Sequence, residues 1–469
     1  MKRVLVAACA LTAAAAALAA PTSAAPARGP RFGEPVLLTT DEAFGGYEPS
    51  IVVDRWNNVV VTAHKQNHNL VVSPDSRATT KVRNMSWIWW SKDHKAFSNM
   101  PGLTPAQEQN HVFGDEGDLA TDDTGHVYFV DTSVVDNSFS RWKASGNGKL
   151  VLETVRPVGP FGEPVDDRPW IAAHGDGVVM YLGNQGDKMT YPGGQVQAGD
   201  GPAYGPGRYT VYMSYDHGDT FDPLGVTLND SGWCRPTADK RRGSKMLYVV
   251  CTNDGGANDV TTNPGEPGFE KGTLWSYVSA DDGRTWTRYQ MGTYSAGDPW
   301  STYPSVAIGR DGTVYALYND NTHQGECNVV KQNTFTCDDN IKSSHLILYT
   351  SRTQGRTWTR QEVTPNKGLV RYSWIDVAPN GTLGIAYYHR PNTTSDWHLM
   401  AATARPGKPF VAAQVSSKPV ATSLFSSPFG DFFQCAFGPD SKLNIAWTSM
   451  DTDLGFEGLN SDIYYARER

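Results

Sequence analysis

A short hairpin pattern that recurs seven times constrains the fold more than any other feature of this chain. Its clearest copy runs from Tyr372 to Tyr388, where two apolar segments flank the turn Pro379–Thr382. Proline and the Asn-Gly pair in this turn supply the fixed and the positive φ angles that a tight hairpin needs. Alternating and β-branched apolar residues on both sides are typical of strands. No segment of useful length between the copies has helical periodicity, so we predict an all-β fold.

The seven copies share an ionisable residue directly before the first strand, and they lie 52 to 69 residues apart. These residues are Glu48, Glu116, Arg168, Arg235, Tyr303, Tyr372 and Asp431. Steps of this length fit a four-stranded blade with its loops. We therefore predict a single β-propeller of four-stranded antiparallel blades. Seven blades are favoured, and six blades with an appended hairpin are the alternative.

The two ends of the chain are predicted to share one sheet. The last copy leaves room for only one further strand, Asp462–Ala466. A strand near the N-terminus, Pro35–Thr40, can complete this sheet. Such closure joins the ends of the ring and removes an exposed strand edge. We expect one propeller domain over residues 32–469.

A second motif, S-x-D-x-G-x-T-W, follows several copies at a steady distance. Ser279–Trp286 and Ser214–Phe221 are its best copies, and Ser351–Trp358 and Ser91–Phe97 are more divergent ones. The Asp and Ser/Thr side chains are expected to bond turn amides, while Gly takes positive φ and the aromatic ring fills the gap between sheets. This motif resembles the Asp-box, or BNR repeat, of the sialidase-like β-propellers of secreted bacterial type. The resemblance covers 32–469, and in that family the motif is structural and lies away from the active face.

In a propeller, the first strand of each blade lines the central channel and starts at one face. The ionisable residues before the repeats are therefore predicted to meet at a common mouth. Tyr47, Asp115, Asp118, Asp167 and Arg371 lie beside them in the sequence and enlarge the cluster. Converging charges and phenols in a concave site are typical of a binding site. The structural alternative is that Arg–Asp pairs join the blades and that Asp167 is scaffold.

Tyr372-Ser373, followed by Pro379–Tyr387, resembles the segment that carries the nucleophilic tyrosine of sialidases. The resemblance implies an exo-alpha-sialidase-like glycoside hydrolase that acts on a terminal acidic sugar at the mouth. A neutral phenol approaches an anomeric carbon that bears a carboxylate without charge repulsion, and sialidases are an exception to the two-carboxylate scheme. Because the pKa of a free phenol is about 10, the nucleophile needs a carboxylate base. The candidates are Glu48, Glu116 and Asp431.

Three arginines are the predicted cationic group for a substrate carboxylate. They are Arg168, Arg235 and Arg371, and each can pair with a carboxylate in bidentate geometry. Tyr303 and Asp167 are the remaining candidates for substrate binding.

The chain also departs from the family pattern. Tyr47-Glu48-Pro49 replaces the family's F/Y-R-I-P signature, so an acid stands where the family has a cation. Two other functions therefore stay open. One is a polysaccharide lyase, with Tyr and His as acid and base and Arg neutralising a uronate. The other is a non-catalytic propeller that binds glycan or protein.

The remaining polar candidates carry weaker signals. His64, Lys65 and His68 follow the first hairpin, and His389 with Arg390 ends the sixth. Surface positions are expected for the first group, with proton transfer or metal binding as the alternative. No cofactor is predicted. Asp118 with Asp122 and Asp123, or Asp320 with Asn321, can offer oxygen ligands to a structural calcium ion, but their spacing does not define a site.

Six cysteines allow two disulfides. Cys234 and Cys251 face each other across a predicted hairpin, and Cys327 and Cys337 close a short polar insertion. Cys435 is left as a buried thiol, and Cys9 lies in the N-terminal segment. Disulfides are typical of secreted proteins.

The N-terminus and the charge point to the same compartment. Residues 1–24 combine Lys2-Arg3, an apolar core and a small-residue cleavage site, as in a secretory signal, and 25–31 form a short leader. The 41 basic and 49 acidic residues give a formal net charge of −8, which argues against nucleic acid or an anionic membrane as partner. We expect a secreted monomer that binds carbohydrate.

Overall fold

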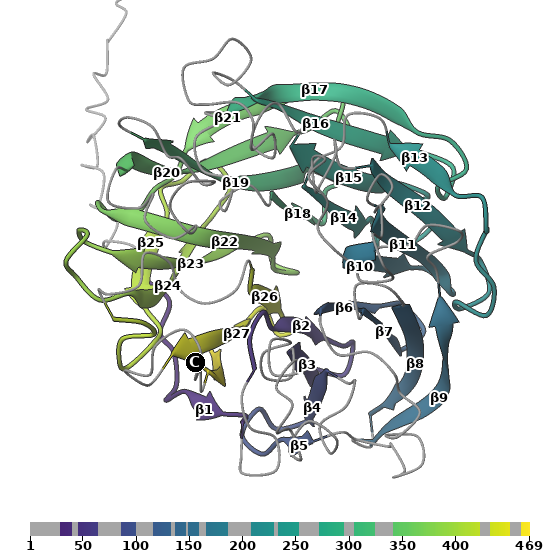
Figure 1. Cartoon of the computed structure of the whole chain (residues 1–469), viewed down its shortest axis with the longest axis horizontal. Helices are drawn as coiled ribbons and strands as arrows, with labels where there is room; N and C mark the ends of the chain where they lie inside the picture. Colours follow the sequence, from purple (N-terminus) through teal and green to yellow (C-terminus); the bar gives the residue numbers. More distant parts are fainter. Residues whose placement is uncertain are drawn as a thin grey trace, which may run out of the picture.

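The computed structural model describes residues 29–39, 46–63, 86–99, 116–132, 137–146, 149–158, 166–185, 208–228, 233–252, 272–294, 304–323, 341–422, 432–450 and 461–469. In these ranges, 28 strands form seven four-stranded antiparallel sheets. Figure 1 shows the sheets as blades around a central axis. The seven-bladed propeller is therefore confirmed, and the six-bladed alternative is wrong.

The strand nearest the axis begins each blade, in the order in which the blades follow along the chain (Figure 1). These inner strands are β2 (Ser50–Val53), β6 (Glu116–Thr121), β10 (Asp166–His174), β14 (Cys234–Ala238), β18 (Ser305–Ile308), β22 (Leu369–Val377) and β26 (Gln434–Phe437). We number the blades 1 to 7 in this order and call the N-terminal end of each inner strand its starting end.

Two further layers lie between the inner strands and the rim. The second strands are β3 (Val59–Ala63), β7 (His126–Thr132), β11 (Val178–Gln185), β15 (Leu247–Thr252), β19 (Val314–His323), β23 (Leu383–Arg390) and β27 (Leu443–Met450). The third strands are β4 (Trp87–Ser91), β8 (Asn137–Ser145), β12 (Arg208–Ser214), β16 (Gly272–Ser279), β20 (Ile341–Ser351), β24 (His398–Ala404) and β28 (Ser461–Arg467).

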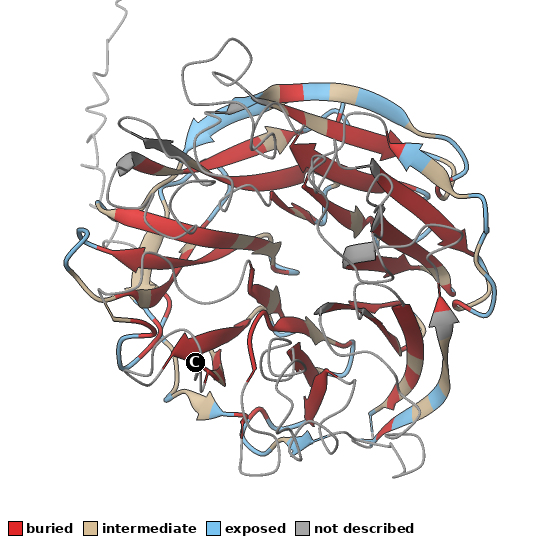
Figure 2. Ribbon diagram, in the orientation of Figure 1, coloured by how far each residue is buried: buried red, intermediate tan, exposed pale blue. Residues whose placement is uncertain are grey.

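The outer strands complete the blades. They are β5 (Ser98–Asn99), β9 (Lys149–Val158), β13 (Val226–Leu228), β17 (Thr287–Tyr294), β21 (Thr359–Glu362) and β25 (Val411–Gln414), with β1 (Val36–Leu37) in blade 7. Burial falls from the second layer to the rim (Figure 2), since all of β23 is buried and all of β21 is exposed. Apolar and β-branched residues fill the second strands because neighbouring blades cover both of their faces. In the described parts of the chain, no helix has the length and hydrophobicity needed to span a membrane.

The predicted closure of the ring is confirmed. In β1, Val36 pairs with Tyr465 and Leu37 with Tyr464, both in β28. The Thr39 hydroxyl donates to Asp462 Oδ1 at 2.6 Å and extends the contact beyond the strand. The last blade thus takes its outer strand from the other end of the sequence, which leaves β28 paired on both sides.

The four Asp-box motifs form turns between the third and fourth strands. In blade 4, the Ser279 hydroxyl donates to Asp281 and accepts from the Gly283 amide, both at 2.8 Å. Asp281 accepts from the amide and hydroxyl of Thr285. In blade 5, Thr353 replaces the aspartate and its hydroxyl accepts from the Thr357 amide. The predicted structural role of the motif is therefore confirmed.

The cysteine predictions divide into confirmed and untested parts. Cys234 and Cys251 pair directly across β14 and β15 and form a disulfide with Cα atoms 4.1 Å apart. Cys435 is free and buried, as predicted. Cys327 and Cys337 lie outside the described residues, so their pairing stays a prediction.

Candidate functional site

The structure describes part of the predicted ring of site residues. Side chains are described for Tyr47, Glu48, Asp118, Arg235, Arg371 and Tyr372, while Glu116, Asp167 and Arg168 are described by their backbone in β6 and β10. Tyr303, Asp431, Asp115, His64, Lys65 and His68 lie outside the described residues. All six described side chains are at most 8% exposed, because they lie on or beside inner strands that face the other blades.

Two inner strands depart from regular pairing at their starting ends. In β22, the register shifts between Arg371 and Trp374, and in β10 it shifts between Asp167 and Trp170. Such bulges redirect side chains away from the regular alternation of a strand. Tyr372 lies in the first bulge with φ +44°, and Glu48 in blade 1 has φ +53°. Positive φ is strained for these residue types, and such strain is concentrated at functional sites.

The Arg235 side chain spans several blades near the axis. Its guanidinium carbon lies 3.6 Å from the centre of the Trp170 ring and 4.3 Å from that of Trp374. Nη2 faces Asp118 at 3.5 Å, and the Arg235 and Asp118 side chains are 6% and 2% exposed. Cation–π contacts of a desolvated guanidinium contribute about 2 kcal/mol. Arg235 from blade 4 therefore joins residues of blades 2, 3 and 6 in a fixed geometry.

Asp118 is held by donors from three other blades as well. Its Oδ1 accepts from Ser50 Oγ at 3.0 Å and from Gln434 Nε2 at 2.7 Å. Its Oδ2 accepts from the Ile171 amide at 3.1 Å. A buried carboxylate is stable only when hydrogen bonds and an opposite charge replace its lost hydration. The predicted structural alternative, in which Arg–Asp pairs join blades, describes this pair.

One hydrogen-bond pattern repeats around the axis. A side chain near the start of an inner strand accepts a hydrogen bond from a backbone amide in the next blade. The acceptor and donor pairs are Ser50 and Leu119, Asp118 and Ile171, Ser305 and Ile375, and Gln434 and Ile51. These bonds at 3.1–3.3 Å link blades 1 to 2, 2 to 3, 5 to 6 and 7 to 1. These hydrogen bonds fix the position of each of these inner strands along the axis relative to its neighbour.

A cluster of aromatic rings packs against Tyr372. Its ring meets Tyr388 edge-on at 6.4 Å, and Tyr388 packs on Phe433 at 4.6 Å. Burial raises the pKa of Tyr388, whose hydroxyl lies 3.3 Å from the Thr448 carbonyl oxygen as a donor. Tyr388 is therefore a neutral supporting residue, and the Tyr372 ring is 8% exposed.

A second ionisable group lies at the opposite end of β22. The Asp376 carboxylate accepts from the amides of Phe437 at 2.6 Å and Val377 at 2.8 Å. Burial raises the pKa of Asp376 to about 6, although both amides and the charge of Lys240 act in the other direction. Lys240, which is exposed along part of its side chain, donates to Thr121 at 2.8 Å.

The last pair of the sixth hairpin is held by its own blade. His389 Nε2 lies 2.8 Å from the Lys367 carbonyl oxygen. Arg390 donates to the Thr393 carbonyl oxygen and lies over the Trp397 ring at 4.5 Å. Both side chains are buried, and these contacts occur within blade 6.

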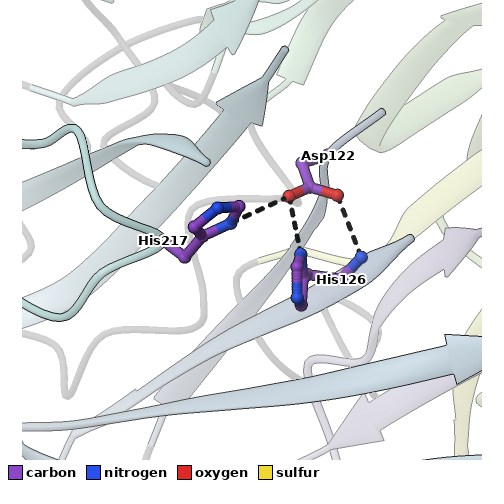
Figure 3. A group of neighbouring side chains, drawn as sticks. All are labelled: Asp122, His126 and His217. Atoms are coloured by element: carbon purple, nitrogen blue, oxygen red, sulfur yellow. Dashed lines mark hydrogen bonds and ion pairs between the residues drawn. The ribbon is translucent and has the colours of Figure 1, made fainter. Parts of the chain in front are cut away.

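The residues suggested as oxygen ligands for calcium lie far apart along β6. Asp118 lies in the strand and contacts Arg235, whereas Asp122 follows its last residue. Four strand residues span about 13 Å, so these two carboxylates cannot bind one ion. Asp122 instead approaches His126 and His217 (Figure 3). Within the described ranges, this is the one group of three such side chains whose ligand atoms lie close enough for a metal ion.

Sequence reasoning missed the two tryptophans that enclose Arg235. Their signal was present, since Trp170 and Trp374 each stand two residues after the ionisable residue of their repeat. The register shifts before them bring both rings to the same arginine. Pattern alone does not reveal this contact, because the three residues belong to blades 3, 4 and 6.

Comparison with known proteins gives distant matches in structure only. No family model and no curated protein matches the sequence. A protein of unknown function from Dyadobacter fermentans has 13% identity and a TM-score of 0.46, covering 94% of this chain and 99% of that chain. Penicillium chrysogenum alpha-L-arabinanase, complexed with arabinobiose, has 12% identity and a TM-score of 0.44, covering 93% and 98%.

The intramolecular trans-sialidase from Ruminococcus gnavus, in complex with oseltamivir carboxylate, is a third match. It has 11% identity and a TM-score of 0.41, covering 92% of this chain and 96% of that chain. Likeness at this level concerns the arrangement of the blades and says nothing about activity. The chain is thus distantly similar in structure to sialidase-type and arabinanase-type β-propellers.

Proposed function

We propose that this chain is a sialidase-type glycoside hydrolase that acts on a terminal acidic sugar at the starting ends of the inner strands. The observation that carries the proposal is the strained backbone of Tyr372, at φ +44° in a bulge of β22. The bulge turns Tyr372 out of the regular alternation of the strand, and backbone strain of this kind is concentrated at functional sites. The segment 1–24 supports the further proposal that the enzyme is secreted.

The chemistry needs a nucleophile, a base and a cationic group. The Tyr372 oxygen would bond to the anomeric carbon while the bond to the leaving oxygen breaks. The phenolic proton would pass to a carboxylate, and the leaving oxygen would take a proton from a carboxylic acid. Water then attacks the same carbon and gives a proton to the carboxylate that had protonated the leaving oxygen, while the tyrosine oxygen departs and takes back its proton from the other carboxylic acid. Glu48, Glu116 and Asp431 are the candidate acids and bases, and Glu48 shares the positive φ of Tyr372.

The arginines of the predicted cationic group have different surroundings. Arg235 is fixed by Trp170, Trp374 and Asp118, so its main contribution is to hold the blades at this level. Arg371 precedes the bulge that contains Tyr372 and belongs to the same strand. We therefore assign substrate-carboxylate binding first to Arg371 and Arg168, and Tyr303 and Asp167 remain further candidates for substrate binding.

A panel of fluorogenic glycosides that includes a sialoside tests the proposal. We expect Tyr372→Phe to lower kcat on the best substrate by at least about 1000-fold, because no other group supplies the attacking oxygen. Tyr387→Phe is the matched control: it removes a hydroxyl from the same hairpin that donates to Asn366 at 2.6 Å. This control should keep full activity and lose about 1 kcal/mol of stability.

Three outcomes contradict the proposal in different ways. Full activity of Tyr372→Phe removes the nucleophile assignment. Products that absorb as unsaturated uronates, with no reducing sugar released, identify a lyase. Glycan binding without turnover of any substrate identifies a binding propeller. Circular dichroism and thermal melting establish in each case that the variant is folded.

A further inference from the structure

A cluster of metal-ligating side chains lies at the opposite end of β6 from Glu116, independent of the site proposed above. Asp122 follows β6, His126 begins β7, and His217 belongs to the Asp-box turn of blade 3. Figure 3 shows both imidazole rings directed at the Asp122 carboxylate. Asp122 Oδ2 lies 2.9 Å from His126 Nδ1 and 3.5 Å from His217 Nδ1.

The Asp122 carboxylate is ionised and rigidly held. Its Oδ1 accepts from the backbone amides of Thr124, Gly125 and His126 at 2.8–2.9 Å. The side chain has no exposed surface. A buried negative charge in this position attracts a cation.

Oδ2 of the same carboxylate is surrounded by more polar groups than its lone pairs can serve. The hydroxyls of Thr124 and Tyr128 donate to it, both at 2.8 Å. The two imidazole nitrogens approach the same atom. Each hydroxyl also approaches one ring: Thr124 Oγ1 lies 2.9 Å from His126 Nδ1, and the Tyr128 hydroxyl lies 3.2 Å from His217 Nδ1. Two imidazole nitrogens, two hydroxyls and one carboxylate oxygen therefore converge on one place between the two turns.

The outer nitrogens of both rings face further carboxylates. His217 Nε2 lies 3.3 Å from Asp176 Oδ1, and His126 Nε2 lies 3.4 Å from Glu153 Oε2. Lys143 Nζ, which donates to the Thr124 carbonyl oxygen, lies 3.3 Å from the same His126 nitrogen. A carboxylate only accepts, so a neutral His217 imidazole that donates Nε2–H to Asp176 presents its Nδ1 lone pair to Asp122. At His126, Glu153 favours the same tautomer, while Lys143, which only donates, competes for the same nitrogen. Metal-binding histidines are oriented by carboxylates in this way.

Blade 1 contains the equivalent turn, with an asparagine at the position of His126. There Asp54 accepts from the Trp56 and Asn58 amides, and the Asn58 side chain donates to Asp54 Oδ2 at 2.7 Å. The amide group of Asn58 is a true donor, so this turn is satisfied by hydrogen bonds alone. At the corresponding place in blade 2, His126 replaces the asparagine, and His217 of blade 3 lies beside the same carboxylate.

The backbone around His217 makes room for its ring. His217 has φ +60°, a conformation shared by the equivalent residue of the other three Asp-boxes. Gly177 lies beside it with φ +78°, and a Cβ atom there would come within 2.4 Å of His217 Nδ1. The His126 and His217 ring centres are 4.7 Å apart at 60°, an orientation that allows both rings to address one point.

We propose that Asp122, His126 and His217 bind one Zn²⁺ ion that joins blade 2 to blade 3. Two imidazole nitrogens and one carboxylate oxygen match zinc, whereas calcium and magnesium prefer oxygen ligands alone. Zinc ligands at about 2.0–2.1 Å in tetrahedral geometry lie about 3.3 Å from one another, close to the separations of 2.9 and 3.5 Å. A water molecule completes the fourth position, since the Tyr128 hydroxyl donates to Asp122 Oδ2 at 2.8 Å. The ion has a structural role.

Zinc titration of the chelator-treated chain tests this site. Isothermal titration calorimetry with Zn²⁺ alone should give one ion per chain, and the melting temperature should rise by about 3–5 °C at 100 times the dissociation constant. His126→Asn reproduces the Asp54–Asn58 pair, and His217→Asn keeps a residue type that tolerates positive φ. Both variants should fold, bind zinc at least about 100-fold more weakly, and lose the thermal shift.

His345→Ala is the control for histidines elsewhere, because His345 pairs with Glu362 on the exposed rim of blade 5. It should bind zinc as the wild type does. The proposal is overturned if the wild-type chain shows neither binding heat nor a thermal shift up to millimolar Zn²⁺. It is equally overturned if His126→Asn and His217→Asn both retain wild-type affinity, because the ion then binds elsewhere.

Discussion

Single side chains near the axis decide how the blades fit together. Arg235 fills the space between Trp170 and Trp374 and compensates the charge of Asp118. Asp376 in blade 6 accepts the Phe437 amide of blade 7 and performs a related task at the other end of β22. The two carboxylates differ in one respect. Asp118 has an arginine at hydrogen-bond distance, whereas the positive charge that acts on Asp376 belongs to Lys240, which donates to Thr121.

The raised pKa of Asp376 predicts a specific dependence of stability on pH. Its folded pKa of about 6 exceeds the ordinary value of 3.8, so the folded chain binds this proton more tightly than the unfolded chain. The resulting stabilisation is complete below pH about 4 and is lost as the pH rises through 6. Two pKa units correspond to about 3 kcal/mol, and the partly exposed side chain argues for about 2 kcal/mol.

Asp376→Asn removes this titration. The variant's free energy of unfolding, relative to the wild type, should therefore increase by about 2 kcal/mol between pH 4 and pH 7.5. Urea denaturation of both chains across that range measures the difference. Parallel stability curves for the two chains would show that Asp376 does not titrate in this window.

Elements in this fold are defined by their turns as much as by their strands. Three of the four Asp-boxes place a glycine with positive φ against the preceding blade, so the motif controls both the corner of its own sheet and the distance to its neighbour. In blade 4 this glycine is Gly283, with φ +84°. A Cβ atom there would come within 2.5 Å of Met213 Sδ in blade 3.

Gly283→Ala should therefore cost about 2–4 kcal/mol, from backbone strain together with steric overlap. Gly407→Ala is the matched control, because Gly407 has φ +73° in the corresponding turn of blade 6, and a Cβ atom there would have no neighbour within 4 Å. That variant should lose about 1 kcal/mol. Thermal and urea denaturation compare them, and equal losses would mean that contact with Met213 contributes nothing.

The whole molecule depends on the closure of a ring from two distant ends. Strand β1 completes blade 7, and the backbone pairing extends to Phe32 with Glu468. The Arg469 amide also donates to the Arg31 carbonyl oxygen at 2.7 Å. Without β1, the edge of β28 would be open to pairing with other chains.

A chain that begins at residue 40 should therefore be less stable and should aggregate on heating. We expect a loss of several kcal/mol, since the change removes a strand and the buried Leu38. A chain that begins at Gly29 keeps the pairing and serves as the control. Light scattering and melting temperature distinguish them, and identical behaviour of the two chains would show that β1 does not secure the ring.

The number of blades, the Asp-box turns, the closing strand and the Cys234–Cys251 bridge were all predictable from sequence. Each depends on a local pattern or on a simple period, and local backbone preferences determine such features. The residue type at the start of each inner strand was also readable, as at Tyr372 and Arg235. The contacts that those side chains make were not predictable from the sequence.

Those contacts depend on tertiary structure for a physical reason. Arg235 meets Trp170 and Trp374 only because two bulges shift the register of β10 and β22, and a shift of this kind leaves no periodic signal. His217 meets Asp122 only because a turn of blade 3 lies against a turn of blade 2. The sequence by itself determined the elements and their order, since these follow from short-range preferences. The partners across blades were decided by the closed ring, in which the position of every blade depends on all the others.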